Sequence, residues 1–396
     1  MDTLKRQSAS LLRQVSTRHI RDLYNHISWD VRLIGIKGAR GVGKTTMMLQ
    51  RIKLAFPDTS KALYVSLDDI WFGGHTLLEL AELAESNGIT HLFIDEVHRM
   101  PGWERQIKNV YDFHPALSIV FTGSSLLEID HSIADLSRRC LLYSLPGLSF
   151  REFLEFEGFS FSKLSLSDIL YDHLKISNEI ISKVDMLRQF GKYLRHGFYP
   201  FYVTETEADY LTRVNNMLSS VIDYDIPAVE NVEYATLLKT KQLVNVIASQ
   251  SPSPLNAKLT ADLMDVSKNQ LVKIFSLLER AQILRLLYFK SGRNPKAMIK
   301  PQKVLFNNPS ILYATGHADK GKVRESFLAS MMSVEHELAY PKDGDLLVDG
   351  RYLFEVGGAR KGFDQIKDIP DSFVAADDIP FGIGNKIPLW LFGFLY

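Results

Sequence analysis

The residues best suited to chemistry in this sequence are nine consecutive ones that read GARGVGKTT. They fit the pattern G-x-x-x-x-G-K-[ST], whose glycines let the backbone curl so that successive N–H groups point at phosphate oxygens. In this pattern the lysine reaches the β- and γ-phosphates, and the hydroxyl that follows ligates Mg²⁺. We therefore predict a site for ATP and Mg²⁺ formed by Gly38, Ala39, Arg40, Gly41, Val42, Gly43, Lys44, Thr45 and Thr46.

A second candidate is the segment LFIDE, in which an apolar run ends in Asp95 and Glu96. In phosphate-binding-loop proteins an acid at this place holds Mg²⁺, directly or through water. An adjacent acid can accept a proton from the attacking water. We predict that Thr45 and Asp95 hold the metal, and that Glu96 is the general base.

Two weaker candidates follow further along the chain. Ser124 comes directly after another apolar run, in the segment FTGSS, where a polar side chain can sense the γ-phosphate. Arg138 and Arg139 come next, and an arginine directed at a γ-phosphate stabilises the charge that develops in phosphoryl transfer. An ordinary turn and two surface arginines are the alternative interpretations of these two segments.

The elements that must position these residues are five short apolar runs separated by helical patterns. The runs are 31–36, 62–67, 91–94, 118–121 and 140–143. Apolar runs that alternate with helices predict an α/β domain with a parallel sheet and helices on both faces. We assign residues 1–147 to this domain, including a helical segment over residues 1 to about 30.

The remaining sequence divides into three segments. Residues 148–230 have a helical, lid-like pattern, and residues 231–290 read as helix, helix, turn, helix and strand, which resembles a winged helix-turn-helix. Its recognition helix would begin near Ser267, with side chains able to meet phosphates and base edges. These candidates are Lys268, Asn269, Gln270, Lys273 and Arg280. DNA is thus a partner to be tested, the alternative being a winged helix that only packs on its neighbours.

Residues 291–396 are expected to form a smaller α+β domain. A helix acid, Glu325, then Asp345 and the strand acid Glu355 resemble the core of PD-(D/E)xK nucleases, in which the carboxylates bind Mg²⁺. The lysine two residues after the last acid is absent, and Lys361 or Lys367 would have to replace it. Without that positive charge we expect a nuclease-like domain that does not cleave. We also predict a strand over 388–394.

Composition excludes several classes of protein. The 396 residues carry 46 Lys and Arg against 46 Asp and Glu, so no overall positive charge points to nucleic acid. A single cysteine, Cys140, excludes an internal disulfide and a multi-cysteine zinc site. No signal-peptide core and no apolar run near the roughly 18 residues of a membrane span are found, so we expect a cytoplasmic protein without a membrane partner.

Several of these segments together resemble a widespread group of prokaryotic AAA+-type ATPases that have a C-terminal domain of unassigned function. The segments are GARGVGKTT, LFIDEVHRMPGWE, VFTGSS, SRRCLLYSLPGLSFREFLEF, KPQKVLF and FEVGG. The resemblance implies ATP binding and hydrolysis, and it implies that Arg139 is the catalytic arginine. The family has a glycine before this arginine, where this chain has Arg138. Relatives often supply the arginine to a neighbouring subunit, so a homo-oligomer is compatible with this assignment.

Three hypotheses about function remain. In the first, the protein is a Mg²⁺-dependent ATPase in which Lys44, Glu96 and Arg139 are catalytic and nucleotide drives a conformational switch, with DNA as a candidate target. In the second, it is a DNA-binding regulator or defence-type switch that uses ATP as a structural ligand. The third is an ATP-gated nuclease, which the missing lysine disfavours.

Overall fold

The computed structural model describes residues 1–123, 136, 138–229, 232–249, 256–289 and 301–396. The chain divides into two units, one of Met1–Gly147 with Ala228–Glu230 and one of Leu148–Pro227 with Asn231–Tyr396. The three segments that we distinguished after residue 147 thus lie together in the second unit, apart from three residues.

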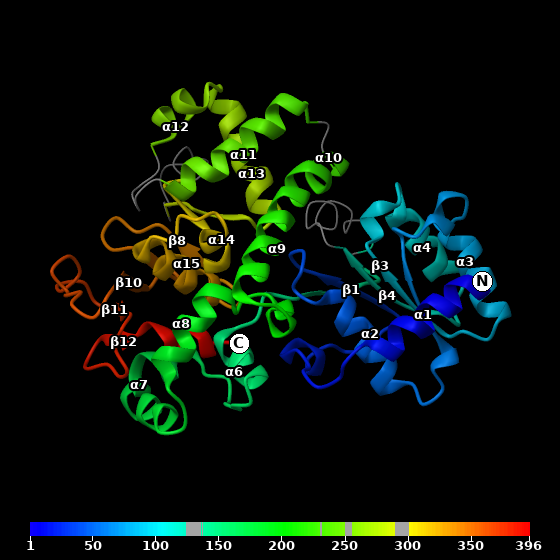
Figure 1. Cartoon of the computed structure of the whole chain (residues 1–396), viewed down its shortest axis with the longest axis horizontal. Coiled ribbons are helices and arrows are strands. Elements are labelled where there is room, and N and C mark those ends of the chain that lie inside the picture. The colour runs from blue at the N-terminus through cyan, green and yellow to red at the C-terminus, as the bar shows by residue number, and fades with distance from the viewer. Residues whose placement is uncertain (124–135, 137, 230–231, 250–255, 290–300) are drawn as a thin grey trace. The chain divides into compact units, whose positions relative to one another are not determined.

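The first unit is built on a parallel five-stranded sheet, as the alternating apolar runs predicted (Figure 1). In spatial order its strands are β2 (Ala62–Ser66), β3 (His91–Asp95), β4 (Ser118–Gly123), β1 (Leu33–Lys37) and β5 (Leu141–Ser144). β1, β3 and β4 are buried almost throughout, because helices cover both faces of a parallel sheet. The carboxyl ends of all five strands meet at one edge, where a ligand is expected.

One helix precedes these strands, and others connect them. They are α1 (Asp2–Gln14), α2 (Lys44–Ala55), α3 (Leu77–Ser86) and α4 (Trp103–Phe113). α3 begins with a capping box between Thr76 and Glu79, and with α4 it contributes to one apolar core that includes Trp103 packed on Phe121. α1 packs against β2, where the Ser8 hydroxyl accepts a hydrogen bond from the backbone N–H of Tyr64 at 3.2 Å.

The second unit begins with helices. They are α6 (Phe150–Phe156), α7 (Leu166–Ile181), α8 (Met186–His196) and α9 (Glu207–Ser220), then a π-helical turn (Val221–Asp225) and α10 (Ile226–Val229). Stacked and edge-to-face rings fill their interior: Phe150 contacts Phe153, Phe190 and Tyr193. The aromatic stripe of α6 is therefore part of a packed core.

Three further helices and a hairpin follow. They are α11 (Tyr234–Ser249), α12 (Ala257–Met264), α13 (Lys268–Arg280) and the antiparallel strands β6 (Leu284–Leu287) and β7 (Lys303–Phe306). The helix expected to begin near Ser267 is confirmed, because Ser267 caps α13 through a capping box with Gln270. Its assignment as a DNA-recognition helix stays a prediction.

The chain ends in a mixed five-stranded sheet. Its elements are α14 (Pro309–Ala314), α15 (Lys320–Met332), β8 (Leu338–Ala339), β9 (Leu346–Val348), β10 (Tyr352–Gly357), β11 (Ser372–Ala376) and β12 (Lys386–Pro388). β8, β9 and β10 form an antiparallel meander, and β10, β11 and β12 run parallel. α15 packs on β10.

Two predicted elements were wrong in part. The helix expected over residues 1 to about 30 ends at Gln14, since Val15 has an extended backbone, and the carbonyls of Ser16 and His19 further on accept hydrogen bonds from the Gln50 side chain. The strand expected over 388–394 is a 3₁₀ helix, Leu389–Phe394, buried at every residue. A short run that is apolar at every position has no period that distinguishes strand from helix.

Candidate nucleotide-binding site

The glycine-rich loop connects the end of β1 at Lys37 to the start of α2 at Lys44. Gly41 and Gly43 have φ of 83° and 99°, which side chains disfavour. A Cβ on Gly38 would lie 2.4 Å from the carbonyl oxygen of Leu145, so the close backbone approach there requires glycine. The predicted residues Gly38 to Thr46 thus form a loop and a helix start directly after a strand, which is the context that phosphate binding requires.

The Lys44 side chain lies back over this loop. Its ammonium donates hydrogen bonds to the carbonyl oxygens of Gly38 at 2.8 Å and Ala39 at 2.9 Å, and the residue is 5% exposed. A buried ammonium gains from a nearby anion, because burial removes the solvation that water would provide. The lysine is therefore positioned to exchange carbonyl contacts for phosphate oxygens.

The Asp95 carboxylate accepts hydrogen bonds from four groups of the site. One of its oxygens accepts hydrogen bonds from the hydroxyls of Thr45 at 2.5 Å and Tyr64 at 2.8 Å. The other accepts from the Thr122 hydroxyl and from the backbone N–H of Glu96, the latter at 3.2 Å. Asp95 is only 2% exposed, so these donors replace water around a buried carboxylate. Hydroxyl and carboxylate oxygens are the ligands that Mg²⁺ prefers, so the residues present fit that ion.

Tyr64 and Thr122 were missed by the sequence analysis. Each is buried on a strand next to β3, and Ile94 pairs with Phe121, which brings Thr122 opposite Asp95. Burial and the Asp95 charge raise the pKa of the Tyr64 phenol, so it stays a donor. Thr122 directly follows the apolar run 118–121, which is a signal that could have identified it, whereas Tyr64 lies inside the run 62–67 and has no such signal.

Glu96 has an unusual backbone conformation, with φ of 55° in the left-handed region. This conformation is strained for a side chain with a Cβ, and such strain clusters at functional sites. Its carboxylate lies 3.4 Å from the ring of His98, whose side chain is 1% exposed. Burial, with smaller contributions from Arg99, Lys44 and Arg40, lowers the pKa of His98 to about 3, so a neutral imidazole faces Glu96.

Arg21 stabilises the loop through hydrogen bonds to backbone carbonyls, and the sequence analysis did not identify it. Its guanidinium donates to the carbonyl oxygens of Val42 at 2.7 Å, Pro146 at 2.9 Å and Gly147 at 2.8 Å, and the residue is 5% exposed. One buried side chain thus connects the phosphate-binding loop with the residues that follow β5.

The structure does not bring Arg139 to Lys44 within one chain. It makes a two-pronged ion pair with Asp112 near the end of α4, at 3.0 and 3.1 Å. Arg139 precedes β5 and therefore lies at the edge of the sheet opposite to the loop, roughly six residues or about 20 Å of strand away. The other weak candidate, Ser124, lies outside the described residues.

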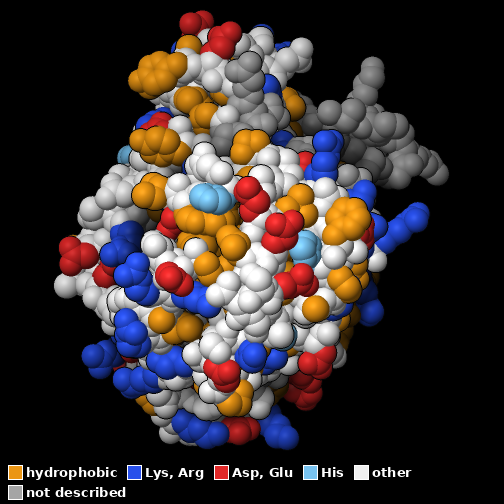
Figure 2. Space-filling model, turned by 90° about the vertical axis from the view of Figure 1, so that its right-hand side faces the viewer, with side chains coloured by type: hydrophobic (Ala, Val, Ile, Leu, Met, Phe, Trp, Pro, Cys, Tyr) orange, Lys and Arg blue, Asp and Glu red, His pale blue; other side chains and the backbone are white. Residues whose placement is uncertain are grey.

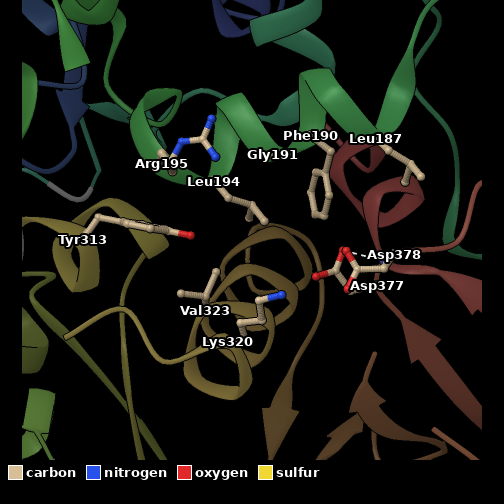
Figure 3. Close-up of a pocket in the computed structure, with 10 residues that line it drawn as sticks. All are labelled: Leu187, Phe190, Gly191, Leu194, Arg195, Tyr313, Lys320, Val323, Asp377 and Asp378. Carbon is tan, nitrogen blue, oxygen red and sulfur yellow. Dashed lines mark hydrogen bonds between the residues drawn. The ribbon is translucent and has the colours of Figure 1, made fainter. Parts of the chain in front are cut away.

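A cavity of about 190 Å³ lies within the second unit (Figure 3). Phe190, Leu194 and Val323 lie between Arg195 on one side and two acids, Asp377 and Asp378, on the other. Both acids pair with Arg324, at 2.8 and 2.9 Å, so its single positive charge offsets part of the negative charge on that side.

On the face drawn in Figure 2, basic and acidic side chains are interspersed, so charge does not mark this face as a nucleic-acid surface. The exposed positions of α13 include Lys268, Asn269 and Gln270, as predicted for its first turn. None of the described helices has both the length and the apolar character needed to cross a membrane.

Comparisons with known proteins agree with this geometry for the first unit. Residues 30–154 match the model of an AAA domain, and residues 187–321 match a domain of unknown function (DUF8612). An uncharacterized protein of Methanocaldococcus jannaschii is 28% identical over 303 residues, which cover 72% of this chain and 62% of that protein, less than two thirds of its length. Residues 30–154 therefore form a P-loop domain of the AAA type, which is a nucleotide-binding fold.

Solved structures give weaker similarities. The AMPPCP-bound DnaA of Aquifex aeolicus is 13% identical, with a TM-score of 0.28 over 70% of this chain and 88% of that one. The ADP complex of Hsp104 from S. cerevisiae is 15% identical, with a TM-score of 0.30 over 70% of this chain and 39% of that one. Scores this low carry no argument about what this chain binds.

Proposed function

We propose that this protein binds ATP with Mg²⁺ and hydrolyses it, and that the nucleotide state switches its conformation. The single observation that carries the proposal is the 2.5 Å hydrogen bond from the Thr45 hydroxyl to Asp95. Donating its proton to the carboxylate leaves the lone pairs of the Thr45 oxygen free for a metal. An Mg²⁺ held by Thr45 and Asp95 would neutralise charge on the phosphate oxygens.

The roles of the other residues follow from their positions. Lys44 would give up its contacts with Gly38 and Ala39 for the β- and γ-phosphates. Glu96 would accept the proton of the attacking water, and a neutral His98 would hold its carboxylate without contributing a competing positive charge. Ser124 remains a proposed γ-phosphate sensor.

Arg139 fits better as a residue supplied to another subunit. Its place at the opposite edge of the sheet prevents it from reaching the phosphates of its own chain without a large rearrangement. An arginine provided in trans stabilises the charge of the transition state and couples turnover to assembly. We therefore propose a homo-oligomer whose sites are completed by the neighbour's Arg139.

Nucleotide binding and turnover are tested with two variants. Lys44→Ala should abolish ATP binding in calorimetry, since it removes the ammonium that lies over the carbonyls of Gly38 and Ala39. Glu96→Gln should bind ATP with wild-type affinity and lose turnover, at least 100-fold, as expected for removal of a general base. Wild-type turnover in Glu96→Gln would refute the assignment of the base, and no ATP uptake by the wild type would refute the proposal itself.

A DNA-binding switch is the second candidate. It is favoured by α13, which begins with three exposed polar side chains and is followed by the β6–β7 hairpin. Binding through phosphates would weaken steeply with salt. A salt titration of DNA binding, run with Lys268→Glu and with Lys5→Glu as a surface control in the first unit, tests it. Equal binding by both variants would remove α13 from the DNA contact.

A further inference from the structure

Carboxylates of the C-terminal sheet region lie next to cationic side chains from other elements. Among these ion pairs, three cations contact five acids whose arrangement bears on metal binding. The pairs are Lys303 with Glu325 and Asp345, Arg324 with Asp377 and Asp378, and Lys361 with Glu355. Three of these acids are the ones that the sequence suggested as ligands of a nuclease metal: Glu325, Asp345 and Glu355.

Lys303 lies at the centre of this arrangement. It comes from β7, and its side chain is 8% exposed. Its ammonium is 2.9 Å from Glu325 on α15 and 3.0 Å from Asp345, which precedes β9. The second oxygen of Asp345 accepts the backbone N–H of Val356 at 2.9 Å, so its orientation is fixed. One cation thus joins a helix and a sheet through two carboxylates that are otherwise close enough to repel each other.

The third acid, Glu355, is also neutralised from within the chain. It is 3% exposed and forms an ion pair with Lys361. The side-chain amide of Gln365, with its nitrogen toward Glu355, donates to both oxygens at 3.0 and 3.2 Å. Both oxygens of this carboxylate are therefore engaged, which opposes a role as a metal ligand.

The physical alternative for two such carboxylates is a divalent cation. Glutamate and aspartate oxygens from a helix and a strand are typical Mg²⁺ and Mn²⁺ ligands. A lysine tethered to a neighbouring strand competes well with a metal ion, because it loses no translational freedom on binding. Among the described residues, no group of three or more His, Cys, Asp or Glu is arranged to hold a metal ion.

We propose that the Lys303 ammonium stands where a divalent cation would lie between Glu325 and Asp345, so that this site is permanently filled by the chain itself. The C-terminal sheet then holds no catalytic metal and does not cleave phosphodiester bonds. The lysine also fastens the β6–β7 hairpin to α15 and the sheet. This inference goes beyond ATP turnover and does not depend on it.

The test is to remove the ammonium and look for a metal. Lys303→Met removes the ammonium, keeps an unbranched side chain that is one atom shorter, and frees both carboxylates. Lys322→Met is the matched control, since Lys322 is another buried lysine, which donates to the backbone carbonyls of Ile247 and Ala248. Mn²⁺ binding is measured by electron paramagnetic resonance on the whole, nucleotide-free chain. Lys303→Met should bind one more Mn²⁺ per chain than the wild type and than Lys322→Met. The affinity of Lys303→Met for this additional Mn²⁺ should be at least tenfold higher than that of either other protein.

A double variant shows where that ion lies. Lys303→Met/Glu325→Gln should lose the additional Mn²⁺, because one of the two ligands has become neutral. If Lys303→Met does not fold alone, refolding with Mn²⁺ replaces the titration, and recovery of the melting transition with Mn²⁺ supports the proposal. If Mn²⁺ does not restore the melting transition of Lys303→Met under conditions in which the double variant folds, the proposal is overturned.

Two further results would overturn the proposal. One is a folded Lys303→Met protein that binds no more Mn²⁺ than the wild type. The other is wild-type protein that cleaves plasmid DNA with Mn²⁺ and loses this activity in Glu355→Gln. ATP turnover is measured in parallel, and its absence would count against the first unit's proposed function only.

Discussion

His98 allows a quantitative test of the electrostatics beside Glu96. Its pKa is lowered from 6.5 to about 3 in the folded chain, mainly by burial, so the unfolded chain binds a proton that the folded chain excludes. Protonation of this group therefore has little effect on the free energy of unfolding above about pH 6.5. That free energy decreases progressively as the pH falls toward 3, because the unfolded chain takes up the proton first. At pH 4.5 the loss is two pH units at about 1.4 kcal/mol each, and it comes to roughly 2.5 kcal/mol relative to pH 7 because the unfolded imidazole is already partly protonated at pH 7.

The assay compares the wild type with His98→Gln, whose neutral amide cannot take up the proton. Three of the four tryptophans, Trp29, Trp71 and Trp103, lie in the first unit, so fluorescence during denaturant unfolding reports chiefly on that unit. Other acid-sensitive groups are common to both proteins and cancel in the difference between them. The wild type should lose about 2.5 kcal/mol more than His98→Gln between pH 7 and pH 4.5. An equal loss in both proteins would refute the buried, neutral imidazole.

Three other variants test the site. Tyr64→Phe removes a hydrogen bond to the charged Asp95 and should cost about 1.5–3 kcal/mol of unfolding free energy, with a weaker apparent affinity for Mg²⁺ in the presence of ATP. Gly38→Ala should cost about 1–3 kcal/mol in thermal unfolding, because its Cβ would meet the Leu145 carbonyl, and a stable, ATP-binding variant would contradict that contact. Arg139→Ala should change stability by less than about 1 kcal/mol, since its ion pair is partly exposed. Arg139→Ala should nevertheless lose ATP turnover. Mixing this variant with an excess of Glu96→Gln subunits, which keep Arg139, should restore turnover only if the arginine acts in trans.

Local sequence was sufficient for the loop and for the position of Asp95. The residues from Gly38 to Thr46 need only a strand before them and a helix after them, and both neighbours have their own apolar patterns. The same patterns predicted the parallel sheet of the first unit, because an apolar strand buried on both faces is recognisable without its partners.

Features that depend on register or on distant elements could not be predicted. Tyr64 and Thr122 reach Asp95 only because of the way β2, β3 and β4 are aligned, and nothing within either segment specifies that alignment. Lys303 is separated from Glu325 and Asp345 by 22 and 42 residues, and an ordinary strand lysine gives no sign of two acids beside it. The ion pair of Arg139 with Asp112 likewise joins segments 27 residues apart.

The Arg21 guanidinium has a mechanical consequence for the first unit. A single rigid, planar guanidinium donates hydrogen bonds to carbonyls of both the phosphate-binding loop and residues 146–147. Neither segment can therefore move without straining the hydrogen bonds to the other. A change in the shape of the loop would therefore be transmitted to residues 146–147, which follow β5. Arg21 thus couples the two segments mechanically. Arg21→Lys removes the planar group, so the loop and residues 146–147 should then move independently.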